Sequence, residues 1–266
     1  IGSWGSPRDL VLPGLALSFR RELTVAPRGG NAAVIAGGPG LGKGTHLERY
    51  ARLLPAVESN TTFSHIHRPA TYERWARSVP AEFRFAVKVS REITHRNRLN
   101  VSDQQLAEFL EGPVALGRKL GPLLVQLPPS FGFDAAHLGR FFRQLRRLHD
   151  GPIACEPRHP SWFTEQGDRV LIDARVARVG ADPAVVPEAA IPGGWPGLVY
   201  VRLHGSPVMY ASPYSDDQLD QAGHVIRARE DPTEAWCVFD NTQFGAAYEN
   251  ARELWRRIAP ATPSPA

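Results

Sequence analysis

The sequence predicts an α/β fold, specifically a (β/α)8 barrel of the TIM type. From residue 45 to residue 258, short apolar runs alternate with stretches whose apolar residues recur every three or four positions. The runs are continuously apolar, as expected of parallel strands that are covered by helices. The chain has 266 residues, close to the ~250 residues of a typical barrel. An open, doubly wound sheet is the alternative.

Eight strands account for the apolar runs if the first six residues also form one. They are expected at residues 1–6, 56–63, 83–89, 122–127, 152–156, 176–181, 198–205 and 235–240. The helices are expected at residues 45–54, 69–79, 102–120, 134–149, 167–174, 215–230 and 245–258. Pro69 suits the first turn of its helix, and Ser102 suits an N-cap. No helix is convincing in the Pro- and Gly-rich connection 183–197.

One N-terminal segment, about residues 10–40, does not fit this rhythm. It is long for a first strand-to-helix loop, and its apolar residues have weak periodicity. We therefore expect a single barrel domain over residues 1–258 with an atypical N-terminal segment. Residues 259–266, APATPSPA, are rich in Pro and Ala and predict a disordered tail.

The composition is that of an ordinary globular chain with a mild excess of positive charge. Hydrophobic residues make up 42% of it, no apolar run approaches the ~18 residues of a membrane span, and no secretion signal is recognisable. The formal net charge of +4 permits binding of phosphate or nucleic acid without requiring it. Cys155 and Cys237 are the only cysteines and lie in apolar runs, so we expect two buried thiols. These features predict a soluble, cytoplasmic protein.

The stretch GGPGLGKGT, residues 37–45, has the spelling of a phosphate-binding loop. Its glycines would let backbone N–H groups curl around phosphate, while Lys43 could reach the terminal phosphates. By itself the stretch resembles the adenylate-kinase form of the loop. A nucleoside monophosphate kinase would also need an arginine-rich lid and an acceptor-binding segment, and neither is recognisable. A glycine-rich surface loop is therefore the main interpretation, and nucleotide binding through this stretch is the alternative.

Six further stretches occur in order along the chain: VESNTTF, WARSVPAEFRFAVKVSREITH, LGPLLVQLPPSF, CEPRHPSWF, YVRLHGS and VFDNTQFGAAYENA. Together they resemble the successive signatures of the YecE-like family, numbered 72 among the domains of unknown function. The resemblance runs from about Gly44 to Ile258 and implies a TIM-type barrel, but it supplies no activity. Roughly residues 11–40 depart from the family pattern.

Reactive groups of a TIM barrel come from the carboxyl ends of its strands and from the loops that follow them. Four polar residues at such positions are candidate catalytic groups: Lys88, Glu156, His204 and Asp240. The candidate ligand-binding residues are Glu58, Asn60, Arg91, His95, Gln126, Arg158, His159, Trp162, Asp182, Arg202, Tyr210 and Asn241. Each also has a structural interpretation, such as a buried ion pair, a helix cap or a solvated side chain.

Taken together, these residues predict a site that accepts an anion. Basic side chains from several strands would make one end of the barrel positive, and guanidinium groups bind phosphate or carboxylate in a fork geometry. The aromatic side chains of Trp162, Phe163, Tyr210 and Tyr214 would offer flat faces to a base or a sugar ring. The expected partner is a small anionic ligand or nucleic acid. No membrane partner is expected, and no protein partner can be inferred.

Two classes of function follow. In the first, the protein is a hydrolase, lyase or isomerase acting on a phosphorylated or nucleic-acid-like substrate, with Glu156 or His204 as acid or base and Lys88 stabilising developing charge. In the second, the barrel binds an anionic ligand or nucleic acid without turning it over. No cofactor is expected. A divalent metal held by the mixed Glu, Asp and His residues is left open, although no compact ligand motif occurs.

Overall fold

The structure is a computed structural model that describes residues 15–20, 46–227 and 234–258. Its strands are β1 (Leu15–Arg20), β2 (Ala56–Ser59), β3 (Arg84–Lys88), β4 (Leu120–Gln126), β5 (Ile153–Glu156), β6 (Val176–Arg178), β7 (Gly180–Asp182), β8 (Gly193–Gly194), β9 (Leu198–Leu203) and β10 (Glu234–Phe239). Its α-helices are α1 (His46–Ala51), α2 (Thr61–Ser64), α3 (Pro69–Arg77), α4 (Asp103–Val114), α5 (Ala135–Leu148), α6 (Glu165–Asp173), α7 (Asp216–Arg227) and α8 (Ala246–Ile258). Shorter helical turns are η1 (Glu92–Arg96), η2 (Gly117–Lys119), η3 (Pro160–Trp162) and η4 (Pro187–Ala190).

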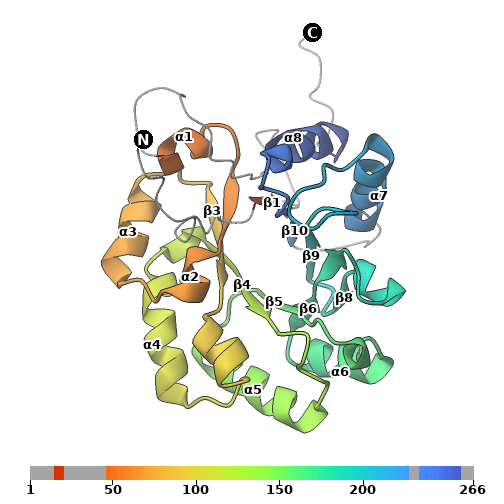
Figure 1. The fold of residues 1–266 in the computed structure, drawn as a ribbon. Coiled ribbons are helices and arrows are strands. Elements are labelled where there is room, and N and C mark those ends of the chain that lie inside the picture. Colours follow the sequence, from red (N-terminus) through yellow and green to blue (C-terminus); the bar gives the residue numbers. More distant parts are fainter. Residues whose placement is uncertain (1–14, 21–45, 228–233, 259–266) are drawn as a thin grey trace, which may run out of the picture.

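The strands form two hydrogen-bonded sheets that follow one another around the molecule, with the longer helices outside them (Figure 1). One sheet has the order β2-β3-β4-β5-β6-β8, and the other has the order β1-β10-β9-β7. Residues 176–182 link them, because β6 pairs with β5 while β7, two residues further on, pairs with β9. Successive βα units from β2 to β10 are thus parallel neighbours. The predicted α/β fold of the TIM type is confirmed.

The N-terminal segment departs from the regular barrel pattern, as the sequence predicts. Its described part is β1, which pairs antiparallel with β10, from Leu15 opposite Phe239 to Arg20 opposite Glu234. Among the strands that the structure describes, no ladder joins β1 to β2. The first strand expected at residues 1–6 and the tail expected at 259–266 lie outside the described residues.

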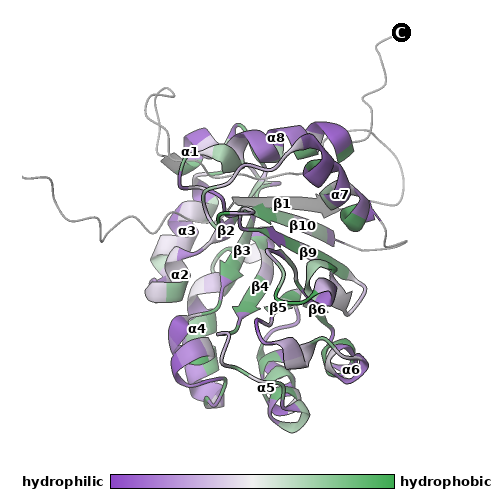
Figure 2. Ribbon diagram, turned by 45° about the vertical axis from the view of Figure 1, so that its right-hand side comes forward, coloured by the Kyte–Doolittle hydropathy of each residue, from purple (hydrophilic) through white to green (hydrophobic). Residues whose placement is uncertain are grey.

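The helices begin where local signals predict them. At the start of α4, the Ser102 hydroxyl accepts from the Gln105 N–H at 3.2 Å, and the Gln105 side chain accepts from the Ser102 N–H at 2.9 Å, which is a complete capping box. Pro69 opens α3 as expected. Figure 2 shows the consequence for packing, since the strands are green and the longer helices are purple on much of their outer surface.

Several predicted elements end or divide earlier than their apolar patterns suggest. The strand expected at 56–63 stops at Ser59, and residues 61–64 form α2. The buried Thr62 hydroxyl lies 2.8 Å from the Ser59 carbonyl and 2.7 Å from the Lys88 carbonyl, so the chain turns inward across the end of β3. The helix expected at 102–120 ends at Val114, and the connection 183–197 contains η4 and β8.

Apolar side chains pack between the strands and the helices in one continuous core. Tyr200 of β9 and Trp236 of β10 stack with ring centroids 6.1 Å apart and planes 3° apart. Cys155 and Cys237 are buried and free, which confirms the predicted buried thiols. In the part of the chain that the structure describes, no helix has the length and apolar character needed to cross a membrane.

Candidate active site

Arg202 is the centre of a polar cluster at the carboxyl ends of the strands. Its guanidinium donates to Glu58 Oε1 at 2.7 Å and Oε2 at 3.1 Å, and to Glu156 Oε2 at 2.7 Å. A longer bond of 3.4 Å joins it to Asp240. These carboxylates come from β2, β5 and the end of β10, so the strands curve around a common centre. Arg202, Glu58, Glu156 and Asp240 form what we term the carboxylate cluster.

The cluster is fully enclosed on the Glu58 side. Glu58 is 0% exposed and Arg202 is 1% exposed, and the Tyr200 hydroxyl donates to Glu58 Oε2 at 2.7 Å. Burial opposes the charge on Arg202, but the three carboxylates outweigh it and hold the pKa of the guanidinium well above its usual range. All three guanidinium nitrogens of Arg202 are engaged, so this arginine positions other groups and has little left to offer a ligand.

Glu156 accepts from three side chains at once. Gln126 donates to Oε2 at 3.0 Å, Arg202 donates to the same oxygen, and the Nε of Arg158 donates to Oε1 at 2.8 Å. Burial would raise the pKa of this carboxyl, but Arg202, Arg158 and His204 hold it well below its usual range. Glu156 is therefore a fixed anion, with one oxygen shared by Gln126 and Arg202 and the other turned toward Arg158 and the rim.

His204 and Asp240 form a buried dyad beside Arg202. His204 Nδ1 lies 3.1 Å from Asp240 Oδ2, and its Nε2 lies 3.3 Å from the Nη1 of Arg202 and 3.6 Å from Glu156 Oε1. Because the Asp240 carboxylate can only accept, His204 Nδ1 carries a proton and donates it to Oδ2. Burial raises the pKa of Asp240, but His204 and Arg202 reverse that effect, and the pKa is below its usual value.

Lys88, the last residue of β3, is buried beside the carboxylate cluster without bonding to it. The residue is 9% exposed, and its Nζ lies 4.3 Å from the centroid of the Phe63 ring on α2. Among the described residues its ammonium has no hydrogen bond or ion pair. Burial, followed by repulsion from Arg202, lowers the pKa of Lys88 to about 8, although the carboxylates oppose this. The amine is therefore partly neutral near physiological pH.

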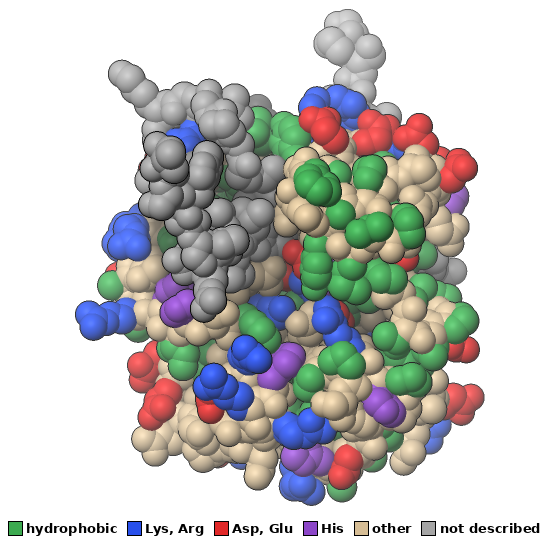
Figure 3. All heavy atoms as spheres, viewed as in Figure 1, with side chains coloured by type: hydrophobic (Ala, Val, Ile, Leu, Met, Phe, Trp, Pro, Cys, Tyr) green, Lys and Arg blue, Asp and Glu red, His purple; other side chains and the backbone are tan. Residues whose placement is uncertain are grey.

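Three cations converge on His95, which lies on η1. Burial and then the charges of Lys88, Arg91 and Arg158 lower the pKa of His95 to about 4, so its ring is neutral at pH 7. Arg91 is exposed, and the hydrogen bond that Arg158 makes to a described residue runs from its Nε to Glu156. We term Lys88, Arg91 and Arg158 the cation group. In the space-filling view, Lys, Arg and His side chains gather around the middle of the face on which α2 lies (Figure 3).

The hydrogen bonds around His95 assign its tautomer. The Thr94 hydroxyl donates its single proton to the Ser90 carbonyl at 2.9 Å, and it also lies 2.9 Å from His95 Nδ1. His95 Nδ1 must then carry a proton and donate it to Thr94. The other nitrogen, Nε2, is left as an acceptor close to the cation group. The same ring meets the Phe63 ring edge-on at 5.0 Å, so Phe63 links His95 to Lys88.

The loop after β9 is fastened to the barrel through Tyr214. Its hydroxyl donates to Asp182 Oδ2 at 2.6 Å and accepts from the Gly205 N–H at 2.7 Å, while its backbone N–H and carbonyl both bond to the Asn250 side chain at 3.0 Å. Asn241 donates to the same Asn250 side chain at 2.9 Å. Asp182 and Asn241, which the sequence predicts as ligand-binding, are thus used inside the structure to hold this loop.

Tyr210 is carried by this loop at the edge of the site. Its φ of 66° lies in the left-handed region, which is unfavourable for a tyrosine. The ring is 42% exposed and meets the His204 ring edge-on, with centroids 5.9 Å apart. The Gln243 N–H donates to the Tyr210 carbonyl at 3.0 Å, which joins the loops after β9 and β10. Tyr210 therefore presents a partly exposed aromatic ring beside His204.

Three other predicted site residues lie apart from these groups or are used locally. Trp162 is 0% exposed, and its indole N–H donates to the Phe131 carbonyl at 2.8 Å, so it is a core residue and not an open ring face. His159 caps η3, where its Nδ1 accepts from the Ser161 N–H at 3.2 Å. Asn60 is buried directly after β2. In this structure the Trp162 ring therefore packs inward, unlike the open ring face that the sequence predicts.

No group of three or more His, Cys, Asp or Glu side chains suited to a metal ion occurs in residues 46–227 and 234–258. The carboxylates closest to such an arrangement are Glu58, Glu156 and Asp240, and each is bonded to the Arg202 guanidinium. The divalent metal that the sequence leaves open therefore finds no ligand set in this part of the chain.

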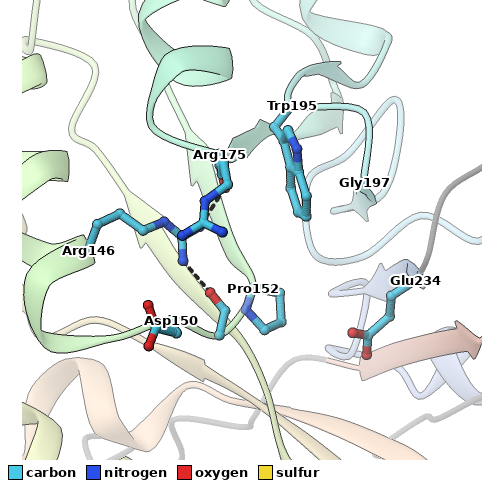
Figure 4. Close-up of a pocket in the computed structure, with 8 residues that line it drawn as sticks. Arg146, Asp150, Pro152, Arg175, Trp195, Gly197 and Glu234 are labelled. Carbon is cyan, nitrogen blue, oxygen red and sulfur yellow. Dashed lines mark hydrogen bonds between the residues drawn. The ribbon is translucent and has the colours of Figure 1, made fainter.

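A cavity of about 160 Å³ lies at the opposite end, among the amino ends of the strands (Figure 4). Its lining residues are Arg146, Asp150, Gly151, Pro152, Arg175, Trp195, Gly197 and Glu234. Arg146 dominates one wall, and its nitrogens donate to the backbone carbonyls of Ala174, His149, Gly151 and Arg175. Arg146 therefore holds together the connection between α5 and β5 and the connection between α6 and β6. The charged side chains that face one another lie instead at the carboxyl ends.

The comparisons with known proteins identify the family. A model described as "Protein of unknown function DUF72" matches residues 36–266. The chain belongs to the DUF72 family. The predicted family is confirmed, and the match begins earlier than the motifs alone indicate, so it includes GGPGLGKGT. That stretch lies outside the described residues, and nothing in these comparisons supports nucleotide binding.

Relatives of this DUF72 protein include the UPF0759 protein YecE of Escherichia coli O157:H7, which is 28% identical over 159 residues, or 59% of this chain and 58% of YecE. The chain thus spans little more than half the length of that relative. The UPF0759 protein YunF of Bacillus subtilis (strain 168) is 22% identical over 238 residues, or 78% of this chain and 84% of YunF. Neither name states a ligand or a reaction.

Two solved structures of the family share the fold. The DUF72 family protein EF0366 of Enterococcus faecalis V583 gives a TM-score of 0.70 at 25% identity, covering 81% of this chain and 94% of that one. TM1631 of Thermotoga maritima MSB8 gives a TM-score of 0.64 at 22% identity, covering 81% and 89%.

Two residues of the site were missed by reasoning from the sequence. Tyr200 has the same two-residue spacing to Arg202 as Arg202 has to His204, and this alternation along β9 would have placed all three on one face. Phe63 falls in the strand predicted at 56–63, whereas in the structure it lies on α2 with its ring over Lys88. No signal in the sequence marks that turn.

Proposed function

We propose that this DUF72 protein binds an anionic ligand, phosphorylated or nucleic-acid-like, at the carboxyl ends of its strands and acts on it by acid–base chemistry. One observation carries the proposal: at the carboxyl ends, the carboxylates and the cation group differ in how far their hydrogen bonds are already made. The carboxylates are bonded to Arg202, whereas the cation group has donors left over and surrounds a neutral His95. An anion from solution would satisfy those donors.

The roles follow from what each group has free. Arg91 and the terminal nitrogens of Arg158 would bind the phosphate or carboxylate of the ligand, because guanidinium groups pair with such anions in a fork. His204, oriented by Asp240, would serve as the acid or base beside the fixed anion Glu156. Such a set suits hydrolysis, elimination or isomerisation. Arg202 acts through these residues as a positioning group.

A flat part of the ligand, such as a base or a sugar ring, would lie against Tyr210. The support is its half-exposed ring beside His204 and the contact that joins its loop to the loop after β10. A cytoplasmic location remains part of the proposal and rests on the two buried free thiols.

Isothermal titration calorimetry tests the binding step, with inorganic pyrophosphate, ribose 5-phosphate and a single-stranded oligonucleotide as separate probes. We expect at least one probe to bind and Arg91→Gln with Arg158→Gln to weaken it at least ~10-fold, as expected when charged donors are lost. Arg77→Gln is the matched control, because its side chain is 71% exposed and pairs only with the exposed Glu73. Equal affinity of the probe for the wild type, the Arg91→Gln/Arg158→Gln double variant and Arg77→Gln would overturn the proposal.

The same probes separate catalysis from binding alone. Conversion of a bound probe, lost in His204→Asn with binding retained, would support acid–base chemistry. Oligonucleotide affinity that falls steeply with salt, with no product from any probe, would instead support a barrel that binds nucleic acid without turnover.

A further inference from the structure

The chain has very few amines, and one of them is buried at the site. Lys43, Lys88 and Lys119 are its only lysines, against 28 arginines in the total of 31 basic residues. An arginine stays protonated in proteins, whereas a lysine can lose its proton and become a nucleophile. Lysine at position 88 therefore permits chemistry that arginine would not.

Lys119 shows what a structural lysine looks like in this protein. Its Nζ donates to the carbonyls of Ala76 and Val79, both at 2.6 Å, and so ties the end of α3 to the start of β4. Within the described ranges Lys88 has no such bonds, and its Nζ lies over the face of the Phe63 ring. An amine held in an apolar contact, near carboxylates but bonded to none of them, is in the situation of a reactive lysine.

We propose that Lys88 forms an imine with the carbonyl carbon of a small phosphorylated aldehyde or ketone. This inference rests on the proposed function, since Arg91 and Arg158 would hold the phosphate while Lys88 meets the carbonyl group. The groups that face Lys88 come from every neighbouring element: Glu58 on β2, Phe63 on α2, His95 on η1, Glu156 on β5, Arg202 on β9 and Asp240 after β10.

The step balances without any further reactant. The neutral Nζ of Lys88 attacks the carbonyl carbon, a C–N bond forms, and the carbonyl electron pair moves to oxygen. Both hydrogens of the amine leave with that oxygen as one molecule of water, and the nitrogen lone pair completes the C=N bond. Protonation from solvent gives an iminium cation, which the anions Glu58, Glu156 and Asp240 would stabilise, as they already favour a positive charge on Lys88.

The experiment is reductive trapping on the intact chain. The protein is incubated with dihydroxyacetone phosphate or glyceraldehyde 3-phosphate and cyanoborohydride, which delivers hydride to the iminium carbon, and the modified amines are mapped by mass spectrometry. Lys119, Lys43 and the terminal amine are internal references. We expect Lys88 to be modified at least ~10-fold faster than Lys119, because the pKa of Lys88 is lowered to about 8 and the Nζ of Lys119 is held by two carbonyls.

Variants separate the imine from simple charge balance. Lys88→Arg keeps the cation but should yield no adduct, and circular dichroism with urea unfolding confirms that it is folded. Arg158→Gln should slow trapping of the phosphorylated probes more than it slows trapping of dihydroxyacetone and glyceraldehyde. Modification of Lys88 no faster than that of Lys119, in a folded protein, would overturn the inference.

Failure of this inference and failure of the proposed function give different results. Anion affinity that depends on Arg91 and Arg158 without an adduct at Lys88 would leave the proposed function standing and remove the imine. A rapid adduct at Lys88 that forms equally with phosphorylated and unphosphorylated probes would support the imine and argue against the anion site.

Discussion

The two ends of this barrel use their cations in opposite ways. At the amino ends, the cations donate to backbone carbonyls. Arg146 bonds to four carbonyls and Lys119 bonds to two. At the carboxyl ends, Arg202 is bonded to carboxylates, whereas Arg158 bonds a described residue through its Nε, and Lys88 has no hydrogen bond to any residue that the structure describes. The comparison teaches that burial of a charged residue does not mark function by itself. What marks it is whether the bonds of that residue are already complete.

The largest effect should come from the centre of the carboxylate cluster. Arg202→Met leaves three carboxylates without their common partner, and we expect the free energy of unfolding at pH 7 to fall by about 3–5 kcal/mol. Urea denaturation measures it. Arg257→Met is the control, because its carboxylate partners Asp216 and Asp220 are exposed, so the loss should stay below about 1 kcal/mol. Similar losses in both variants would contradict the central role of Arg202.

At the other end, Arg146→Met should affect stability but not binding. Loss of its donors leaves several backbone carbonyls unpaired, and we expect unfolding to become easier by about 2–4 kcal/mol. The affinity for whichever anionic probe binds the wild type should not change. Arg91→Gln should do the reverse, with weaker binding and a change in stability below about 1 kcal/mol, because Arg91 is exposed. Weaker anion binding in Arg146→Met would move the functional site to the amino-end cavity.

A pair of lysine variants sharpens the contrast, because the effects should differ in sign. Lys88→Met should stabilise the fold at pH 7 by about 1–3 kcal/mol, since it removes a buried charge whose pKa is lowered to about 8. Lys119→Met should destabilise it by about 1–2 kcal/mol through the lost hydrogen bonds. Both are measured by urea unfolding.

The advantage of Lys88→Met should depend on pH in a defined direction. Below about pH 8 the wild-type lysine is protonated whether the chain is folded or unfolded, so the variant keeps its full advantage. Between pH 8 and the ordinary lysine value of 10.5, only the unfolded wild type holds the proton, so its stability rises with pH and the gap closes. A gap that is constant up to pH 10 would contradict the lowered pKa.

The smallest effect should be the contribution of Glu156 to the free energy of unfolding, which is lost at low pH. Its pKa is lower in the folded state than in the unfolded chain, so its contribution is complete above the ordinary value of 4.5 and is lost as the pH falls below that. Glu156→Gln should flatten the decline in unfolding free energy between about pH 5 and pH 2, by about 1 kcal/mol or more. An unchanged slope would show that Glu156 is not a stabilised anion.

The sequence predicted the fold and the end of the barrel at which charges gather, for a physical reason. Continuous apolar runs identify strands that are covered on both faces, and the polar residue that ends each run falls at the carboxyl edge by geometry alone. Lys88, Glu156, Arg202 and Asp240 were found in this way. The order of six short motifs then indicated the family.

What could not be predicted depends on contacts between distant parts of the chain. Glu58 and Arg202 are 144 residues apart, and nothing local tells which of several carboxylates a guanidinium will bond. Trp162 looked available for a ligand because it follows a strand, yet its indole N–H found a buried carbonyl and the ring joined the core. The antiparallel pairing of β1 with β10 likewise depends on a partner that lies far along the chain.

The attachment of the loop after β9 has a consequence for how a ligand would meet Tyr210. Because Tyr214 is bonded to Asp182 and Asn250 as well as to Gly205, that loop cannot swing aside independently of β7 and α8. Tyr210, which this loop carries beside His204, is therefore held in place before a ligand arrives and is not brought there by a movement of the loop.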